Sequence, residues 1–414
     1  MIGDALDVLE KYIKDGVDLN IEMCKFTSRC YELFLNQQLP ISVRLTAIKC
    51  IGYSLSNAEP SFVLQSLNTI LAPRLQRLQG IVDGQCTSSS SSLEALEAEC
   101  LFEISVFSSL MATLKIKIKS ESDSNLNLSV DTESPALIVL QQSIPFFRDL
   151  IAKFSSSETL VDKVCDALRS GLAVVDRNYA LIIKYYCEVI DEILLKHVDI
   201  VSNFAKSVIL IFASTDVSSI LFSSLVKWLE EINRTGESEI AEGYIDLIYH
   251  LIKKSWNLFL VDQNNSLSAL ENVVNIALKN LAKNPSNPLL TRKSAALLTI
   301  LILKASDIFD ELFQRNAQRI VTILFSQIKI EMIQATIESI AEALMSREYC
   351  QNTQGTLLTA PRLSLLITEI SYIAELPYGT SHFVAILKEC YRKRQFKQLC
   401  IVFNQSVRKE LQSG

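Results

Sequence analysis

Apolar residues recur three and four positions apart along almost the whole chain, and short helix-stopping segments interrupt this pattern at regular intervals. A period of 3.6 residues places the apolar side chains on one side of a helix, so the sequence predicts helix followed by short loop from end to end. Two helices per unit of about 40 residues is typical of HEAT and armadillo repeats. The predicted fold class is therefore all-α: a HEAT-repeat α-solenoid, a superhelical arch of antiparallel helix pairs.

The length and composition fit an elongated solenoid better than a single compact core. The chain has 414 residues, whereas one hydrophobic core stops growing at roughly 250–300 residues. Apolar residues make up 49% of the chain, and the mean hydropathy of +0.24 is high for a chain without a membrane span. A solenoid explains this value, because neighbouring repeats cover the interior helices on both sides.

Composition also limits the cellular compartments and the kinds of partner that we expect. The densest apolar stretches, such as 297–303 and 208–213, are short, and a membrane span needs about 20 apolar residues, so we expect no membrane insertion. The ten cysteines are scattered without a C-x-x-C pair, which favours buried thiols in a reducing compartment, the cytoplasm or nucleus. The net charge of −6 and the pI of 5.4 argue against direct nucleic-acid binding and suit basic protein partners.

The chain is predicted to divide into three parts. Residues 1–118 form the first HEAT-like repeats, residues 119–135 form an acidic, polar and non-periodic insertion, and residues 136–414 form the C-terminal repeats with a terminal helix. The predicted helices cover 1–15, 19–36, 40–56, 61–79, 93–118, 136–154, 157–173, 178–195, 197–213, 217–234, 237–262, 265–284, 288–304, 308–326, 328–346, 360–376, 380–391 and 393–411.

Residues suited to catalysis are sparse. The three histidines, His197, His250 and His382, have no second His, Cys or carboxylate at metal-ligand spacing, so packing or solvated roles are favoured. No phosphate-binding glycine loop and no nucleophile elbow occurs. We therefore expect no enzyme activity, no cofactor and no metal.

Several helices carry an acidic stripe opposite their apolar stripe. The second helix of each HEAT pair usually lines the concave face, so these stripes are expected to point into the groove and to contact a protein partner. The candidate partner-binding residues are Asp162, Asp166, Glu239, Glu242, Asp246, Glu331, Glu338 and Glu342. The alternative interpretation is that they form only the solvated side that any solenoid helix needs, since Glu is a good helix former.

The basic run at 391–397, YRKRQFK, has three interpretations. It could be a nuclear-localisation-like patch, a nucleic-acid contact, or the exposed first face of the terminal helix. The third is favoured, because Phe396, Leu399, Cys400 and Val402 continue an amphipathic pattern through the run.

Several segments resemble the importin-β superfamily, in particular the branch that includes importin-13 and transportin-3. The segment 48–79, IKCIGYSLSNAEPSFVLQSLNTILAPRLQRLQ, resembles a middle repeat in which the long helix carries a Pro at the same place. The segments 134–154, SPALIVLQQSIPFFRDLIAKF, and 157–172, SETLVDKVCDALRSGL, resemble the helix pair after that branch's variable acidic loop. The segment 391–411, YRKRQFKQLCIVFNQSVRKEL, resembles its terminal helix.

This resemblance implies a nuclear transport receptor. The chain would correspond to the C-terminal half, which contacts protein cargoes, while Ran-GTP would bind mainly through an N-terminal half missing here; nuclear pore proteins would be further partners. Members of the branch are considerably longer, so we expect a fragment or a truncated product. The alternative function is a static HEAT scaffold in a cytosolic complex. A helical enzyme is a third class of function, and the finding of stoichiometric bound metal would favour it.

Overall fold

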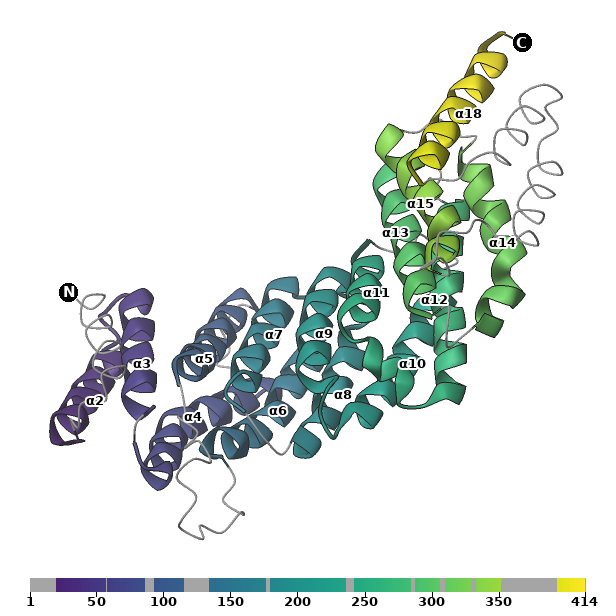
Figure 1. Ribbon diagram of the computed structural model, residues 1–414. Helices are drawn as coiled ribbons and strands as arrows, with labels where there is room; N and C mark the ends of the chain where they lie inside the picture. Colours follow the sequence, from purple (N-terminus) through teal and green to yellow (C-terminus); the bar gives the residue numbers. More distant parts are fainter. Residues whose placement is uncertain are drawn as a thin grey trace. The chain divides into compact units, whose positions relative to one another are not determined.

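The structure is a computed structural model that describes residues 20–56, 58–85, 93–114, 134–175, 179–235, 242–283, 287–305, 310–328, 333–350 and 393–413. Within those ranges the regular elements are helices and no strand occurs (Figure 1). The all-α prediction is therefore confirmed. The chain forms two compact units, which we call unit 1 (Met1–Val208) and unit 2 (Ile209–Gly414).

Unit 1 stacks its helices in two rows. The elements are α2 (Asn20–Leu35), α3 (Ile41–Leu55), α4 (Pro60–Val82), α5 (Leu93–Thr113), α6 (Pro135–Lys153), α7 (Glu158–Leu172), the 3-10 turn η2 (Tyr179–Leu181), α8 (Ile183–Ile193) and α9 (Val198–Phe212), within which the unit boundary falls. Helices α3, α5 and α7 pack side by side in one row, and α4, α6 and α8 in the other (Figure 1). Contacts of α4 with α5 and of α6 with α7 join the rows, which is the arrangement of a two-layer solenoid.

Unit 2 repeats this arrangement. Its elements are α10 (Ser218–Thr235), α11 (Glu242–Lys254), the 3-10 helix η3 (Trp256–Leu260), α12 (Gln263–Lys283), α13 (Pro288–Ala305), α14 (Asp310–Ile328), α15 (Gln334–Cys350) and α18 (Lys393–Ser413). Helices α11, α13 and α15 form one row, and α10, α12 and α14 form the other (Figure 1). The terminal helix α18 packs on α15 and α14.

Local sequence signals account for the helix starts. Pro60 and Pro135 each occupy the first turn of a helix, where the missing N–H leaves no bond unmade. The side chain of Ser157 accepts a hydrogen bond from the N–H of Leu160 and caps α7. After α4, Gly84 adopts a φ of 73°, a conformation that favours glycine over residues with a Cβ.

Lysine side chains of one repeat donate hydrogen bonds to carbonyls at helix ends in the preceding repeat. Lys153 Nζ donates to the carbonyls of Ile81 and Val82 at the end of α4, over 2.6 and 2.7 Å. Lys279 Nζ donates to the carbonyl of Asn233 near the end of α10 over 2.6 Å. These bonds tie neighbouring repeats together at helix ends, where backbone carbonyls have few intrahelical donors.

One close approach fixes the packing of α3 on α5. A Cβ built on Gly52 would lie 2.1 Å from Thr113 Oγ1 and 2.8 Å from the carbonyl oxygen of Leu110. The two helices therefore touch at a point where any side chain larger than hydrogen would push them apart.

The structure differs from the sequence prediction at 237–262, where a single helix was expected. Helix α11 ends at Lys254, and a 3-10 helix follows. Asn257 Nδ2 donates to the carbonyl of Ala213 over 2.6 Å, and Ser266 Oγ donates to the carbonyl of Phe259 over 2.6 Å. These tertiary bonds hold the chain in a turn that its apolar periodicity did not indicate.

Four predicted segments fall wholly or mostly outside the described residues. These are the helices at 1–15, 360–376 and 380–391 and the insertion at 119–135, whose last residue, Pro135, begins α6. The predicted division of the chain at this insertion stays a prediction.

Candidate functional site

Exposed and partly exposed carboxylates gather at the beginnings of α5 and α7, which pack against each other in unit 1. We call Glu94, Glu97, Glu158 and Asp162 the carboxylate patch. Glu97 accepts a hydrogen bond from Ser157, the residue that caps α7, so the starts of the two helices meet there. None of the four forms an ion pair with a described residue.

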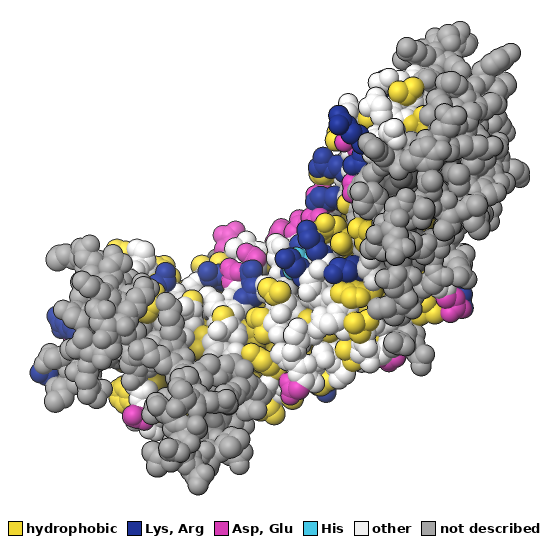
Figure 2. All heavy atoms as spheres, viewed as in Figure 1, with side chains coloured by type: hydrophobic (Ala, Val, Ile, Leu, Met, Phe, Trp, Pro, Cys, Tyr) yellow, Lys and Arg dark blue, Asp and Glu magenta, His cyan; other side chains and the backbone are white. Residues whose placement is uncertain are grey.

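Helix geometry explains why acidic residues are favoured at this place. The free N–H groups of a helix start carry partial positive charge, which stabilises carboxylates in the first turns. Glu94 and Glu97 lie one turn apart on α5, and Glu158 and Asp162 lie one turn apart on α7. Figure 2 shows acidic side chains gathered at one end of α7, with basic side chains beside them. The patch therefore presents several carboxylates to solvent.

The predicted candidates on α11 are already neutralised within the protein. Lys293 Nζ from α13 lies 2.7 Å from Asp246 Oδ2 and also donates to Glu242. Burial alone would lower the pKa of Lys293, but its hydrogen bonds to Asp246 and Glu242 outweigh that effect and raise the pKa above its usual value. Figure 2 shows the corresponding run of basic and acidic side chains over α11 and α13.

The candidates on α15 are also bonded within the protein. Glu342 Oε2 lies 3.2 Å from Lys397 Nζ of α18. Glu338 accepts a hydrogen bond from the side-chain amide of Gln334 over 2.8 Å. Helices α11 and α15 thus each carry acidic residues that meet a lysine from the next helix packed on them.

The remaining candidates differ from one another. Asp162 is exposed and belongs to the carboxylate patch, whereas Asp166 pairs with Arg169 on the same helix. Glu239 and Glu331 lie outside the described residues. The partner-binding role of the whole set stays a prediction.

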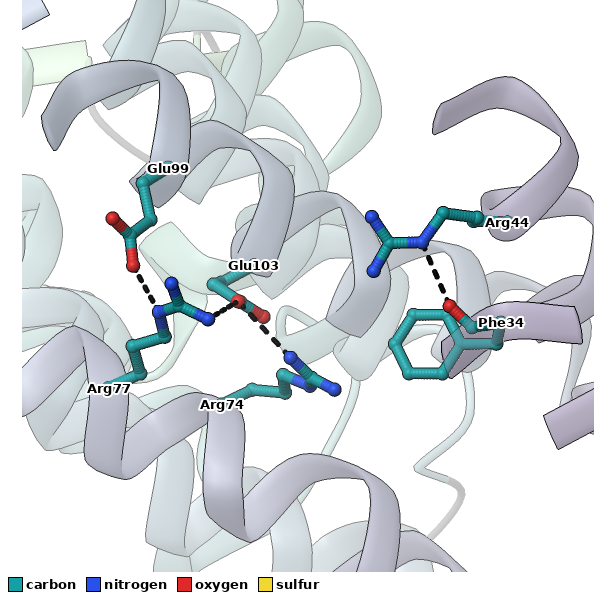
Figure 3. Close-up of polar contacts among 6 residues, drawn as sticks. All are labelled: Phe34, Arg44, Arg74, Arg77, Glu99 and Glu103. Atoms are coloured by element: carbon teal, nitrogen blue, oxygen red, sulfur yellow. Dashed lines mark hydrogen bonds and ion pairs between the residues drawn. The ribbon is translucent and has the colours of Figure 1, made fainter. Parts of the chain in front are cut away.

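A buried ionic cluster between α4 and α5 escaped the sequence analysis. The side chain of Glu103 is only 1% exposed, and its Oε1 lies 3.3 Å from Arg74 Nη1 and 3.7 Å from Arg77 Nη1. Arg77 also pairs with Glu99 (Figure 3). Glu103 Oε2 and Arg74 Nε are buried and have no hydrogen-bond partner, so the pairing is incomplete.

Burial dominates the electrostatics of this cluster. It raises the pKa of Glu103, although Arg74 and Arg77 act in the opposite direction. The sequence does contain a signal for it: Glu103 is the one charged residue in the apolar run CLFEISVF at 100–107. A lone carboxylate in such a run indicates a buried pair, because an isolated buried charge is costly.

Catalytic chemistry has little support among the described residues. No group of three or more metal-ligating side chains occurs there. Burial raises the pKa values of Cys100 and Cys165 to about 12, so these thiols are protonated and weakly nucleophilic at neutral pH. His197 Nε2 lies 2.7 Å from the carbonyl oxygen of Ser155, a contact that ties two neighbouring repeats. No helix in the described part of the chain is both long and apolar enough to cross a membrane.

Comparison with known proteins gives a likeness of fold without a likeness of sequence. No family model matches the chain, and no curated protein matches its sequence. Among solved structures, one described as "Importin13 cytosolic state" matches with a TM-score of 0.69 and 13% sequence identity. The match covers 97% of this chain and 45% of the importin chain, so this chain spans less than half the length of that protein.

The chain has the fold of an importin HEAT-repeat solenoid. The predicted fold class is thereby confirmed. Because the sequence identity is 13%, the likeness concerns the fold, and it extends over nearly the whole chain.

Proposed function

We propose that the chain is the C-terminal, cargo-binding arch of a nuclear transport receptor similar to importin-13. The observation that carries the proposal is the fold match to Importin13 over 97% of this chain but only 45% of that protein. The sequence segments that resemble the same branch support it independently. In this proposal the protein binds other proteins and catalyses no reaction.

A solenoid suits this function for a physical reason. Each repeat contacts mainly its neighbours, so small rotations at many helix interfaces add up to a change in curvature. A partner that binds one curvature better than another shifts the population toward it. In the complete receptor, Ran-GTP would bias the solenoid between cargo-holding and cargo-releasing curvatures, acting mainly through the N-terminal half.

The carboxylate patch is the surface that we assign to cargo. Its four acidic residues, Glu94, Glu97, Glu158 and Asp162, have no cationic partner among the described residues. A Lys- or Arg-rich segment of a cargo would supply the missing cations without displacing an existing ion pair. The acidic pairs on α11 and α15 are weaker candidates, because Lys293 and Lys397 would have to be displaced first.

The other partners and the localisation follow from the same proposal. A receptor of this class binds nuclear pore proteins as well as protein cargoes and shuttles between cytoplasm and nucleus. Direct binding of nucleic acid and insertion into a membrane form no part of it.

A pull-down from nuclear extract tests the proposal. The chain serves as bait, with and without excess GTP-locked Ran, and a variant with Glu158→Gln and Asp162→Asn serves as the matched control. Retention of a few nuclear proteins by the unchanged chain, and weaker retention by the variant, is expected. Displacement by Ran-GTP would show that this half retains part of the release machinery.

A different result would favour the static scaffold instead. If the chain retained one fixed cytosolic assembly, indifferent to Ran-GTP and to the variant, the transport function would be wrong. Microinjected fluorescent protein offers a second readout, since a receptor arch should concentrate at the nuclear envelope or in the nucleus and a cytosolic scaffold should not.

A further inference from the structure

Two arginines stack on a pair of aromatic rings, the buried Phe34 and the partly exposed Phe102, in the first repeats of unit 1. The rings of Phe34 (α2) and Phe102 (α5) lie nearly parallel, with centroids 6.5 Å apart. The guanidinium carbon of Arg44 (α3) lies 4.5 Å from the Phe102 centroid, and that of Arg74 (α4) lies 4.9 Å from the Phe34 centroid. Four successive helices thus meet at one cation–π cluster.

One hydrogen bond holds the guanidinium of Arg44 in place, and the described residues leave its other N–H donors unsatisfied. Its Nε donates to the carbonyl oxygen of Phe34 over 2.8 Å, as Figure 3 shows. Its two terminal amino groups have no hydrogen-bond acceptor among the described residues. Arg74 and Arg77, in contrast, are paired with Glu103 and Glu99. Arg44 therefore presents a pre-oriented donor fork, and the side chain is partly exposed.

The charged groups of this cluster sum to one net positive charge. The cluster holds the guanidinium groups of Arg44, Arg74 and Arg77 against the carboxylates of Glu99 and Glu103. Burial, and next the positive charge of Arg74, lower the pKa of Arg44, with Glu103 opposing. An added monoanion would relieve the repulsion between Arg44 and Arg74.

Two exposed apolar side chains, Leu35 and Ile41, lie near Arg44 along the chain. Leu35, next to the residue whose carbonyl binds Arg44, is 47% exposed. Ile41 is 57% exposed and lies one helical turn before Arg44 on α3. A surface that combines a guanidinium fork with adjacent large apolar side chains matches a peptide in which a carboxylate stands beside an apolar residue.

We propose that Arg44, with Leu35 and Ile41, binds an acidic–apolar peptide segment of a partner protein, the carboxylate of a Glu or Asp pairing with the two terminal amino groups of Arg44. The guanidinium fork donates two parallel hydrogen bonds to a planar carboxylate. The single net positive charge of the cluster matches a monoanion better than a dianionic phosphate. The inference rests on the protein-binding function proposed above, but it concerns a surface and a partner chemistry different from those of the carboxylate patch.

A titration with synthetic peptides tests this site. A fluorescein-labelled peptide carrying Glu-Leu pairs between Gly and Ser residues is added to the full chain, and fluorescence anisotropy is followed at low salt. Matched peptides replace Glu by Gln, Leu by Ser, or Glu by phosphoserine. Binding of the Glu-Leu peptide is expected to be about tenfold tighter than binding of the Gln peptide, because a charge-assisted bidentate pair is lost in the latter.

Variants of the protein locate the binding. Arg44→Gln should weaken binding of the Glu-Leu peptide about tenfold, and Arg44→Lys should give an intermediate loss because it keeps the charge but not the fork. Arg29→Gln is the matched control, since Arg29 is an exposed arginine of α2 already paired with Glu32. Ile41→Ser should weaken binding of the Glu-Leu peptide but leave binding of the Glu-Ser peptide unchanged.

Several outcomes would overturn the inference. These are equal binding of the Glu and Gln peptides, equal losses for Arg44→Gln and Arg29→Gln, or tighter binding of the phosphoserine peptide. If Arg44→Gln lowers the melting temperature, the comparison of the matched peptides on the unchanged protein still decides the question. A Lys-rich peptide titrated in parallel reports on the carboxylate patch, so failure of this inference is distinguishable from failure of the proposed function.

Discussion

The two units share one repeat architecture but use their acidic residues differently. In unit 2, Glu242 and Asp246 meet Lys293, and Glu342 meets Lys397, each lysine coming from the next helix packed on the same side. In unit 1, the four residues of the carboxylate patch meet no cation among the described residues, while Glu103 is paired with Arg74 and Arg77 and buried between α4 and α5. An acidic stripe on a solenoid helix is therefore a candidate binding surface only where the adjacent helix has not supplied the counter-ion.

The largest expected effect is on stability, and it comes from breaking the buried ion pair of Glu103. Arg74→Met removes the closer partner of Glu103, whose side chain is 1% exposed, and leaves Arg77 at 3.7 Å. We expect the free energy of unfolding of unit 1 to fall by about 3 kcal/mol, because a buried charge loses its main partner. Urea unfolding with hydrogen exchange read on α4 and α5 measures the loss.

Arg29→Met serves as the exposed counterpart of that variant. Arg29 and Glu32 are 74% and 64% exposed, so their pair should contribute less than about 1 kcal/mol. Equal losses for Arg74→Met and Arg29→Met would mean that solvent screens the Glu103 cluster as well, and the contrast between buried and exposed pairs would disappear.

Binding of a basic peptide compares the two kinds of acidic surface directly. The double variant Glu158→Gln/Asp162→Asn should bind a Lys-rich peptide about fivefold more weakly, which corresponds to two exposed pairs of about 0.5 kcal/mol each. The double variant Glu242→Gln/Asp246→Asn should change the affinity less than twofold, because Lys293 already neutralises those carboxylates. Anisotropy titrations at low and at physiological salt give both numbers, and a larger loss in the second variant would reverse the assignment.

Removal of Lys293 should leave the acidic residues of α11 without a counter-ion among the described residues, as in the carboxylate patch of unit 1. Lys293→Met keeps the apolar stem but leaves Glu242 and Asp246 without their cation. We expect a loss of stability of about 1 kcal/mol and binding of the Lys-rich peptide that is about twofold tighter. Lys279→Met provides a matched control, since that lysine bonds to a backbone carbonyl and pairs with no carboxylate in the described part of the chain. Unchanged binding by Lys293→Met would show that charge pairing does not decide which face is available.

Helix positions were largely predictable from the sequence, because they depend on a periodicity that each segment carries by itself. The predicted helix at 157–173 is α7, Glu158–Leu172, and the capping Ser157 marks its start in the sequence as well. The end of α11 was not predictable, since it depends on a hydrogen bond between Asn257 and Ala213, which are 44 residues apart.

The candidate site was less predictable for a related reason. The spacing of Glu242 and Asp246 correctly puts them on one helix face, but their partner Lys293 comes from α13 and is 47 residues beyond Asp246. The register between packed helices is set by tertiary contacts and leaves no local mark in the sequence. Glu103 is the exception, because a single carboxylate within an apolar run does indicate a buried pair.

The smallest expected effect concerns the pH dependence of unit 1. Burial raises the pKa of Glu103 above its ordinary value of 4.5, so the folded protein holds this proton more tightly than the unfolded chain does. The contribution of Glu103 to the free energy of unfolding therefore falls as the pH rises from about 4.5 through the raised pKa, and then levels off. Glu103→Gln has no proton to release, so subtracting its stability from that of the unchanged protein isolates this contribution. Urea unfolding at a series of pH values should show that difference decreasing with pH. An increase with pH would instead show that Arg74 and Arg77 outweigh burial, and that the cluster behaves like the exposed pairs of unit 2.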